Sequence, residues 1–202
     1  MLTVGIYLFD EVEVLDFAGP FEVFSTASRL AVLRGEAAPF RVLLIGRHAA
    51  AIRARGGLRV EVDVSLEAPL ELDVLLVPGG VVTAELRDQH LIDWIASTAP
   101  TTQLTASVCT GAFLLAAAGL LDGKQATTHW EDLEDLQRSF PRVRVTDGRR
   151  FIDLGDVVTS AGISAGLDMS LHLVRRLASA ELALATARQM DYEWVDDDEV
   201  MG

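Results

Sequence analysis

Short apolar runs alternate with longer stretches of helical periodicity along this chain. A run of four to eight apolar residues between turn residues is typical of a strand buried on both faces. We expect such strands at residues 4–9, 40–45, 73–77, 103–108 and 157–160, short strands at 143–145 and 151–153, and a half-exposed hairpin strand at 58–64. We expect helices at 20–33, 84–98, 110–118, 131–140, 164–178 and 181–190. This alternation predicts an α/β protein with helices on both faces of a mostly parallel sheet.

Length and composition favour one domain. The chain has 202 residues, of which 50% are hydrophobic and 23% charged, as in ordinary globular domains. We assign residues 1–192 to a single domain and residues 193–202 to an acidic tail that contains Asp196, Asp197, Asp198 and Glu199. With one cysteine, Cys109, the chain forms no internal disulfide and no four-cysteine zinc site, so we expect no metal.

The charge balance excludes two classes of partner. Seventeen Lys and Arg residues stand against 30 Asp and Glu residues, which gives a net charge of −13. Proteins that hold nucleic acids or anionic lipids through phosphates need clustered positive charge, so we expect neither partner. The first residues lack a basic signal region, and no run approaches the ~20 apolar residues of a membrane span. We therefore expect a cytoplasmic protein.

The candidate site lies where the predicted strands end. Ligands of open parallel sheets bind at the carboxyl ends of the strands. That rule directs attention to residues 10–20, to the Pro-Gly-Gly turn at 78–80 and to residues 109–111.

Cys109 stands between a predicted strand and a predicted helix, on a corner that resembles the nucleophile elbow of hydrolases. Such a turn strains the backbone, and we expect Cys109 in a strained conformation. The amides of Thr110 and Gly111 favour the thiolate and could contribute to an oxyanion hole, so we expect a pKa below the ~8.5 of a free cysteine. The alternative is a buried structural cysteine.

Five segments in order carry a resemblance to a known family: Leu15-Asp16-Phe17-Ala18-Gly19-Pro20, Pro78-Gly79-Gly80, Cys109-Thr110-Gly111, Ala126-Thr127-Thr128-His129-Trp130 and Gly162-Ile163-Ser164-Ala165-Gly166-Leu167-Asp168. Together they resemble the ThiJ/PfpI superfamily, whose fold is class I glutamine-amidotransferase-like, from about Thr3 to Met190. The resemblance is strongest to isocyanide hydratases and to the N-terminal domains of AraC-type regulators. It implies a flavodoxin-like three-layer sandwich and a homodimer, for which an apolar first helix with Phe17, Phe21 and Phe24 is a further indication.

The resemblance also implies roles for site residues. Asp16, a glutamate in most of the superfamily, would lie beside Cys109 and act as the general acid, although aspartate also suits a helix cap. Gly79 and Gly80 would supply an oxyanion-hole amide, although a turn needs glycine anyway. Thr110 matches the hydratases and stands where protease-like relatives have histidine. A Cys-His dyad cannot form there, so we exclude protease activity.

Four further residues are candidates for the pocket. His129 is a second possible base, or a structural histidine. Ile163, Trp130 and Phe17 would line the pocket or belong to the core. We expect His48, His90 and His172 to be structural, with His172 on a solvated polar stripe between Asp168 and Arg176.

Three functions remain open at this point. The first is a lyase that hydrates a small-molecule isocyanide to an N-substituted formamide without a cofactor. The second is a ligand-sensing or redox-sensing domain that lacks the DNA-binding part of the AraC-type regulators. The third is glyoxalase-type carbonyl chemistry, which Asp16 and Thr110 disfavour.

Overall fold

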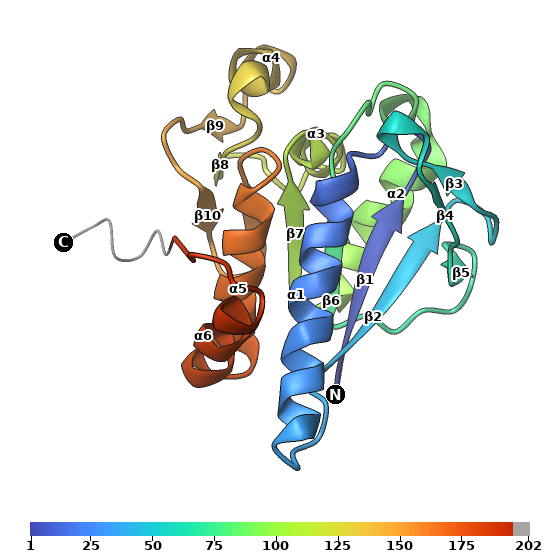
Figure 1. The fold of residues 1–202 in the computed structure, drawn as a ribbon. Coiled ribbons are helices and arrows are strands. Elements are labelled where there is room, and N and C mark those ends of the chain that lie inside the picture. Colours follow the sequence, from blue (N-terminus) through green and yellow to red (C-terminus); the bar gives the residue numbers. More distant parts are fainter. Residues whose placement is uncertain (196–202) are drawn as a thin grey trace.

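The apolar runs of the sequence form the central sheet of the structure, a computed structural model that describes residues 1–195 (Figure 1). Within those residues the main sheet has seven strands, in the order β10 (Phe151–Asp153), β11 (Val157–Ser160), β7 (Leu104–Val108), β6 (Val74–Val77), β1 (Leu2–Leu8), β2 (Phe40–Gly46) and β5 (Val64–Ser65). Neighbouring strands are parallel except β10 and β11, which are antiparallel. The prediction of a mostly parallel sheet is confirmed.

Helices cover both faces of the sheet, as the alternating pattern predicts (Figure 1). On one face α1 (Val14–Leu33), α5 (Ala165–Leu177) and α6 (Ala180–Gln189) pack against one another, and on the other lie α2 (Gln89–Thr98) and α3 (Gly111–Ala117). Outside the main sheet, α4 (Leu133–Ser139) packs beside the paired strands β8 (Gln125–Ala126) and β9 (Arg144–Val145). The central strands β6, β7 and β11 are buried along their whole length, because helices remove both faces from water.

The first helix begins earlier than the sequence pattern predicts. Pro20 was expected in the first turn, but α1 starts at Val14 and Pro20 lies inside it. Proline has no amide hydrogen, so it cannot donate to the carbonyl group four residues before it, that of Asp16. Burial of Phe17, Pro20 and Phe24 against the core stabilises the helix in spite of this loss. The early start places Asp16 in the first turn of the helix.

The half-exposed strand predicted at 58–64 is divided in two. Arg59–Val60 form β4 and pair antiparallel with β3 (Ile52–Arg53), so the predicted hairpin is confirmed for this part. The following pair, Val64–Ser65, joins the edge of the main sheet as β5. Residues 61–63, which lie between them, form no strand.

His172 does not lie on a solvated stripe, and that prediction is wrong. Its residue surface is 6% exposed, and its Nε2 atom lies 2.7 Å from Oδ2 of Asp153 on β10. The edge strand β10 covers this face of α5, which helical spacing alone could not show. Asp168, one turn earlier, is fully buried and makes an ion pair with Arg150.

Two of the three phenylalanine side chains expected at a dimer interface pack into the core of the chain itself. Phe24 is fully buried and Phe17 is 5% exposed, whereas Phe21 is 37% exposed. The homodimer therefore stays a prediction. In residues 1–195, no helix combines the length and the apolar character needed to cross a membrane.

The start of the expected acidic tail is attached to α5. The amide of Val195 donates to Oδ1 of Asp168 at 2.9 Å, and the Arg175 guanidinium lies over the ring of Trp194, 5.5 Å from its centroid. The acidic residues Asp196, Asp197, Asp198 and Glu199 lie outside the described residues.

Replacing Asp168 with alanine should lower the free energy of unfolding by about 3 kcal/mol. The substitution leaves the Tyr192 hydroxyl, the Val195 amide and the Arg150 guanidinium without their buried acceptor. Urea unfolding measures the loss. Asp93→Ala is the control, because this exposed carboxylate bonds only to Gln89 on the same helix among the described residues, and we expect a change within about 0.5 kcal/mol.

Candidate active site

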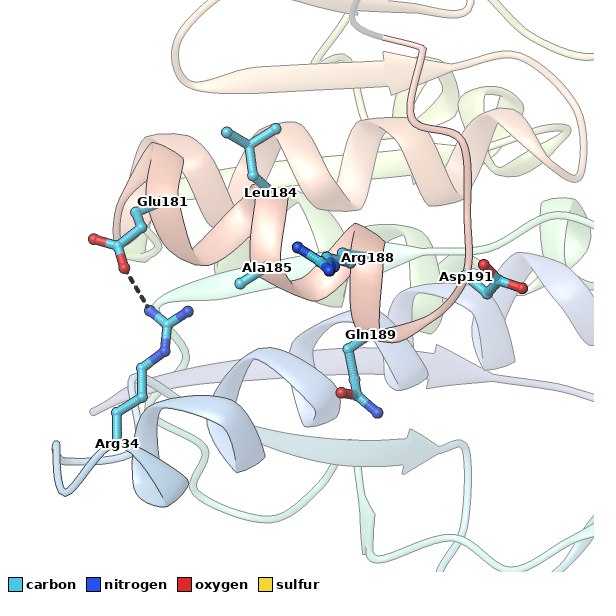
Figure 2. Close-up of a pocket in the computed structure, with 7 residues that line it drawn as sticks. All are labelled: Arg34, Glu181, Leu184, Ala185, Arg188, Gln189 and Asp191. Atoms are coloured by element: carbon cyan, nitrogen blue, oxygen red, sulfur yellow. Dashed lines mark hydrogen bonds and ion pairs between the residues drawn. The ribbon is translucent and has the colours of Figure 1, made fainter.

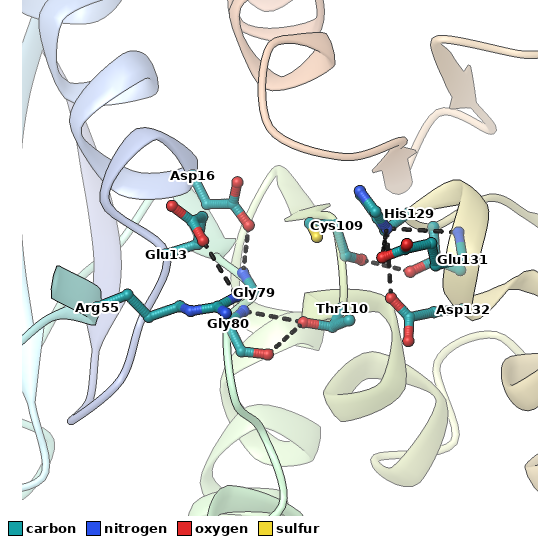
Figure 3. A network of polar contacts seen from close by, with 11 residues as sticks. Glu13, Asp16, Arg55, Gly79, Gly80, Cys109, Thr110, His129, Glu131 and Asp132 are labelled. Atoms are coloured by element: carbon teal, nitrogen blue, oxygen red, sulfur yellow. Dashed lines mark hydrogen bonds and ion pairs between the residues drawn. The ribbon is translucent and has the colours of Figure 1, made fainter.

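Three segments meet at the carboxyl ends of neighbouring parallel strands. Asp16 follows β1, Gly79 follows β6 and Cys109 follows β7. The register of the sheet sets Ile6 beside Leu76 and Leu76 beside Ala106, so the three strands end at one edge. The three stretches that the strand-end rule selects are therefore adjacent in space, and their side chains face one another in Figure 3.

Cys109 occupies a sharp turn between β7 and α3. Its φ angle is 55°, in the left-handed region that non-glycine residues rarely adopt, so the predicted strain is confirmed. Two contacts hold the backbone there: the amide donates to the Ser160 carbonyl at 3.2 Å, and the Thr128 hydroxyl donates to the Cys109 carbonyl at 2.8 Å. The residue is 7% exposed. The turn thus holds a largely buried thiol at the sheet edge.

Two glycines allow the elbow to approach the neighbouring strand. A Cβ atom on Gly111 would lie 2.1 Å from the carbonyl oxygen of Val77, and one on Gly79 would lie 2.6 Å from the Thr110 amide nitrogen. Neither contact is sterically possible without a shift of the backbone. A side chain at either position would therefore push the cysteine turn away from the end of β6.

Asp16 is a fully buried carboxyl group at the centre of the site. Its Oδ2 atom accepts a hydrogen bond from the Gly79 amide at 3.1 Å, whereas its Oδ1 atom has no partner among the described residues. It is not a helix cap, because Glu13 holds that position in α1. Burial raises the pKa of Asp16 to about 7, against the lowering effect of the Gly79 hydrogen bond. Asp16 can therefore both take up and release a proton near neutral pH.

The pKa of Cys109 departs from the expectation. Burial, followed by the charge of Asp16, raises the pKa of this thiol to about 12, so the predicted lowering is wrong. The hydrogen bond from the Thr110 amide opposes the rise, but α3 has two turns and offsets little of the cost of burying a thiolate. The charge of Asp16 acts on the thiol, and the expected hydrogen bond between the two side chains stays a prediction. At neutral pH the proton therefore resides on sulfur until a base removes it.

Thr110 fixes the turn at Gly80. Its hydroxyl group donates to the Gly80 carbonyl and accepts from the Gly80 amide, both at 2.9 Å. The Gly79 amide is likewise engaged, with Asp16. The amides of Gly79 and Gly80 thus hold Asp16 and Thr110 in this arrangement. The role of these amides, and of those of Thr110 and Gly111, toward a substrate stays a prediction.

The other candidate residues differ in exposure. Nδ1 of His129 accepts from the Glu131 amide at 3.4 Å and lies 3.6 Å from the Asp132 carboxylate. The imidazole fills the space over Gly162, where a Cβ atom would lie 2.0 Å from its Cδ2 atom. Ile163 has a positive φ of 52° and is 37% exposed, Trp130 is 71% exposed, and Phe17 belongs to the buried core. Their roles in a pocket stay predictions.

Two charged residues beside Asp16 were not found from the sequence. Glu13 precedes Asp16 by one helical turn, and its Oε2 atom lies 3.3 Å from the Arg55 guanidinium (Figure 3). The spacing of Glu13 and Asp16 is a signal that could have been used. For Arg55 there was none, because the turn that carries it is brought to the site by tertiary packing.

A surface hollow lies at the other end of α1 from Asp16. It measures about 640 Å³ and is lined by Arg34, Glu181, Leu184, Ala185, Arg188, Gln189 and Asp191 (Figure 2). Arg34 follows the last turn of α1, roughly 27 Å along the helix from Asp16 at 1.5 Å per residue. The residues that line this hollow include no nucleophile and no buried carboxyl group. Within residues 1–195 no group of three potential ligands is arranged to hold a metal ion.

A comparison with protein families agrees with this geometry. The model of the DJ-1/PfpI family matches residues 2–176. The chain belongs to the DJ-1/PfpI family. Membership agrees with the fold and with the position of the cysteine turn, and it confirms the resemblance found in the five sequence segments.

Two kinds of DJ-1/PfpI relative resemble the chain over nearly its whole length. An isonitrile hydratase from Pseudomonas putida is 33% identical over 192 residues, which are 95% of this chain and 78% of the hydratase. The transcriptional regulator GbdR from Pseudomonas aeruginosa is 30% identical over 198 residues, which are 98% of this chain. The chain spans about half of the regulator, 52% of its length.

Solved structures show the same DJ-1/PfpI fold. A ThiJ/PfpI family protein from Pseudomonas syringae superposes with a TM-score of 0.84 at 24% identity, covering 96% of this chain and 76% of that protein. Drosophila melanogaster DJ-1beta superposes with a TM-score of 0.82 at 20% identity, covering 96% of this chain and 99% of that one. These likenesses establish the flavodoxin-like architecture that the strand pattern and the five segments imply.

The buried acid of this DJ-1/PfpI domain should make its stability depend on pH. The pKa of Asp16 is raised from 3.8 to about 7, so the folded state favours the protonated form. Its stabilising effect is complete below the unfolded pKa and is lost as the pH rises through about 7. From about pH 4.5 to about pH 8, the wild type should lose about 3 kcal/mol relative to Asp16→Asn. Urea unfolding of both proteins at the two pH values tests this, and parallel pH dependences would contradict it.

Proposed function

We propose that this DJ-1/PfpI domain is a cysteine-dependent lyase that hydrates isocyanides to N-substituted formamides. The observation that carries the proposal is the buried carboxyl group of Asp16, which has one unpartnered oxygen and lies at the same sheet edge as Cys109. Hydration of an isocyanide needs a nucleophile and a group that moves one proton twice, and this pair meets both needs. The similarity to the isonitrile hydratase supports the proposal.

The first half of the reaction joins sulfur to the substrate. The ionised Asp16 takes the thiol proton while the sulfur of Cys109 forms a bond to the terminal isocyanide carbon. Asp16 then delivers the same proton to that carbon, which yields a thioimidate bound to Cys109 and regenerates the carboxylate. A pKa near 7 suits a group that must take and give a proton at neutral pH.

The second half adds water. Asp16 takes a proton from a water molecule as the water oxygen adds to the thioimidate carbon, and it then gives that proton to the nitrogen, which regenerates the carboxylate. The carbon–sulfur bond then breaks, the new hydroxyl becomes the formamide carbonyl, and the proton it loses returns to the sulfur of Cys109. One water molecule is consumed, and no electrons are transferred.

Two of the backbone amides expected at an oxyanion hole are already engaged. A tetrahedral oxyanion needs free donors aimed at the developing charge. The amides of Gly79 and Gly80 are bonded to Asp16 and Thr110, so an oxyanion hole would depend on the amides of Thr110 and Gly111. Attack on an isocyanide develops negative charge on carbon, which a proton from Asp16 neutralises. Thr110, in place of a histidine, fits this proposal because it holds the Gly80 turn and carries no base.

Incubation of the protein with several isocyanides should release formamides, measured by chromatography. Cys109→Ala should abolish turnover because no sulfur is left to attack the carbon. Asp16→Asn should also abolish turnover, but its thiol should still react with iodoacetamide, with the pH of half-maximal alkylation lowered by about one unit because a like charge is removed. Loss of alkylation in Asp16→Asn, or full turnover without this acid, would refute the mechanism.

A second candidate function is a ligand-sensing or redox-sensing domain. The observation that favours it is the match to a transcriptional regulator over 98% of this chain. An aldehyde panel beside the isocyanides covers glyoxalase-type carbonyl chemistry in the same assay. If neither panel gives turnover above Cys109→Ala while peroxide readily oxidises the thiol, the sensing function replaces the hydratase proposal.

A further inference from the structure

An ion pair at the edge of the site lies beside the catalytic acid. Oε2 of Glu13 is 3.3 Å from the Arg55 guanidinium, and the Glu13 side chain is 24% exposed. Figure 3 shows both side chains on the Asp16 side of the cysteine turn. The Glu13 side chain makes no capping hydrogen bond to α1, although the residue holds the cap position. Its charge is therefore directed to Arg55 and not to the helix end.

Backbone hydrogen bonds fix the pair relative to the site. The Glu13 amide donates to the Gly79 carbonyl at 2.9 Å, and the Arg55 amide donates to the Val12 carbonyl at 3.0 Å. Val12 also pairs with Gly80 in an isolated bridge. Residues 11–13 thus lie between the turn that carries Arg55 and the Gly79–Gly80 turn that binds Asp16. The distance from the pair to the carboxyl group is set by rigid backbone.

The charged groups that face Asp16 come from three elements. Glu13 at the start of α1 raises the pKa of Asp16, whereas Arg55 on the turn before β4 and Cys109 on the cysteine turn lower it. The Gly79–Gly80 turn and Thr110 present only neutral groups. Across the site Asp132, which pairs with His129, acts on the thiol and raises its pKa. Arg55 is a cation that lowers the pKa of Asp16, and it is paired with Glu13, which raises it.

We propose that Arg55 is a positioning residue for the proton of Asp16, because by neutralising Glu13 it lets the carboxyl group ionise at the pH at which the enzyme works. The catalytic consequence rests on the function proposed above, whereas the electrostatic effect does not. Without Arg55, the uncompensated Glu13 would keep the proton on Asp16 up to a higher pH, so less of the base that accepts the thiol proton would be present at neutral pH. Without Glu13, the uncompensated Arg55 would hold Asp16 ionised and weaken it as a proton donor to the substrate carbon.

Removal of either charge alone should shift the apparent pKa of Asp16, in opposite directions for the two residues. A general loss of structure would not produce such opposite shifts. Arg55→Gln should raise the apparent pKa of Asp16 by about 0.5–1 unit, and Glu13→Gln should lower it by a similar amount. The double variant should return to within about 0.3 unit of the wild type, because the two charges cancel. The matched control is Arg59→Gln, on the same hairpin, whose side chain has no ion pair within residues 1–195 and should cause no shift.

The primary measurement does not require turnover. Carboxyl-carbon NMR of protein labelled with ¹³C-aspartate follows the titration of Asp16, whose signal is assigned by its loss in Asp16→Asn. Low ionic strength keeps the effect of the partly exposed Arg55 unscreened. The pH profile of kcat/KM with an isocyanide is the second measurement, and its acidic limb should move in the same direction and by the same amount as the NMR titration.

The outcomes separate the two proposals. Opposite NMR shifts without isocyanide turnover would support the role of Arg55 and refute the hydratase. Isocyanide turnover with unshifted NMR titrations would support the hydratase and overturn the role of Arg55. Shifts of both single variants in one direction would overturn it too, since that pattern reports a change in burial. Urea unfolding confirms that each variant is folded before it is scored.

Discussion

The burial of one carboxyl group is the constraint on which the site depends. Asp16 is fully removed from water, and its ionised form is stabilised by a single backbone hydrogen bond, by Cys109 and by the charge of Arg55. Burial of a charge with so few partners costs several kcal/mol, which the fold must offset through its core. In return the group holds and releases a proton near neutral pH, which an exposed aspartate cannot do. The thiol of Cys109 is subject to the same burial, which raises its pKa, and in the proposed mechanism the ionised Asp16 takes its proton as sulfur attacks the substrate.

Backbone strain accompanies this burial. Cys109 and Ile163 both have positive φ angles, which are costly for residues with a side chain and most of all for a β-branched one. Three glycines allow close contacts that a side chain would block. Gly79 and Gly111 let the end of β6 and the cysteine turn approach each other, and Gly162 leaves room for the His129 ring. The fully buried strands β6, β7 and β11 supply the rigidity that keeps these conformations. The site is therefore assembled from loops but held by the centre of the sheet.

Sequence reasoning found the architecture and the cysteine because both depend on local pattern. An apolar run followed by Cys-Thr-Gly and a helical segment can hardly fold other than as a strand, a corner and a helix. It failed where a residue far along the chain decides the environment. The strand β10 covers His172, core packing extends α1 through Pro20, and the burial of Cys109 outweighs the helix amides that favour its thiolate. Each of these errors has the same origin, since desolvation depends on all the neighbours of a residue and not on its own segment.

The sequence by itself determined the parallel α/β arrangement and the strand-end location of the site. It also singled out Cys109, Asp16 and Thr110 as candidate site residues. Hydrophobic periodicity and glycine turns are local, and parallel strands bring their carboxyl ends to one edge whatever the details of packing. Only the tertiary structure decided the proton chemistry. Whether Cys109 or Asp16 holds the proton depends on burial, on the Gly79 amide and on the charges of Glu13 and Arg55. These groups come from four separate parts of the chain, and electrostatic energies depend on their distances in space.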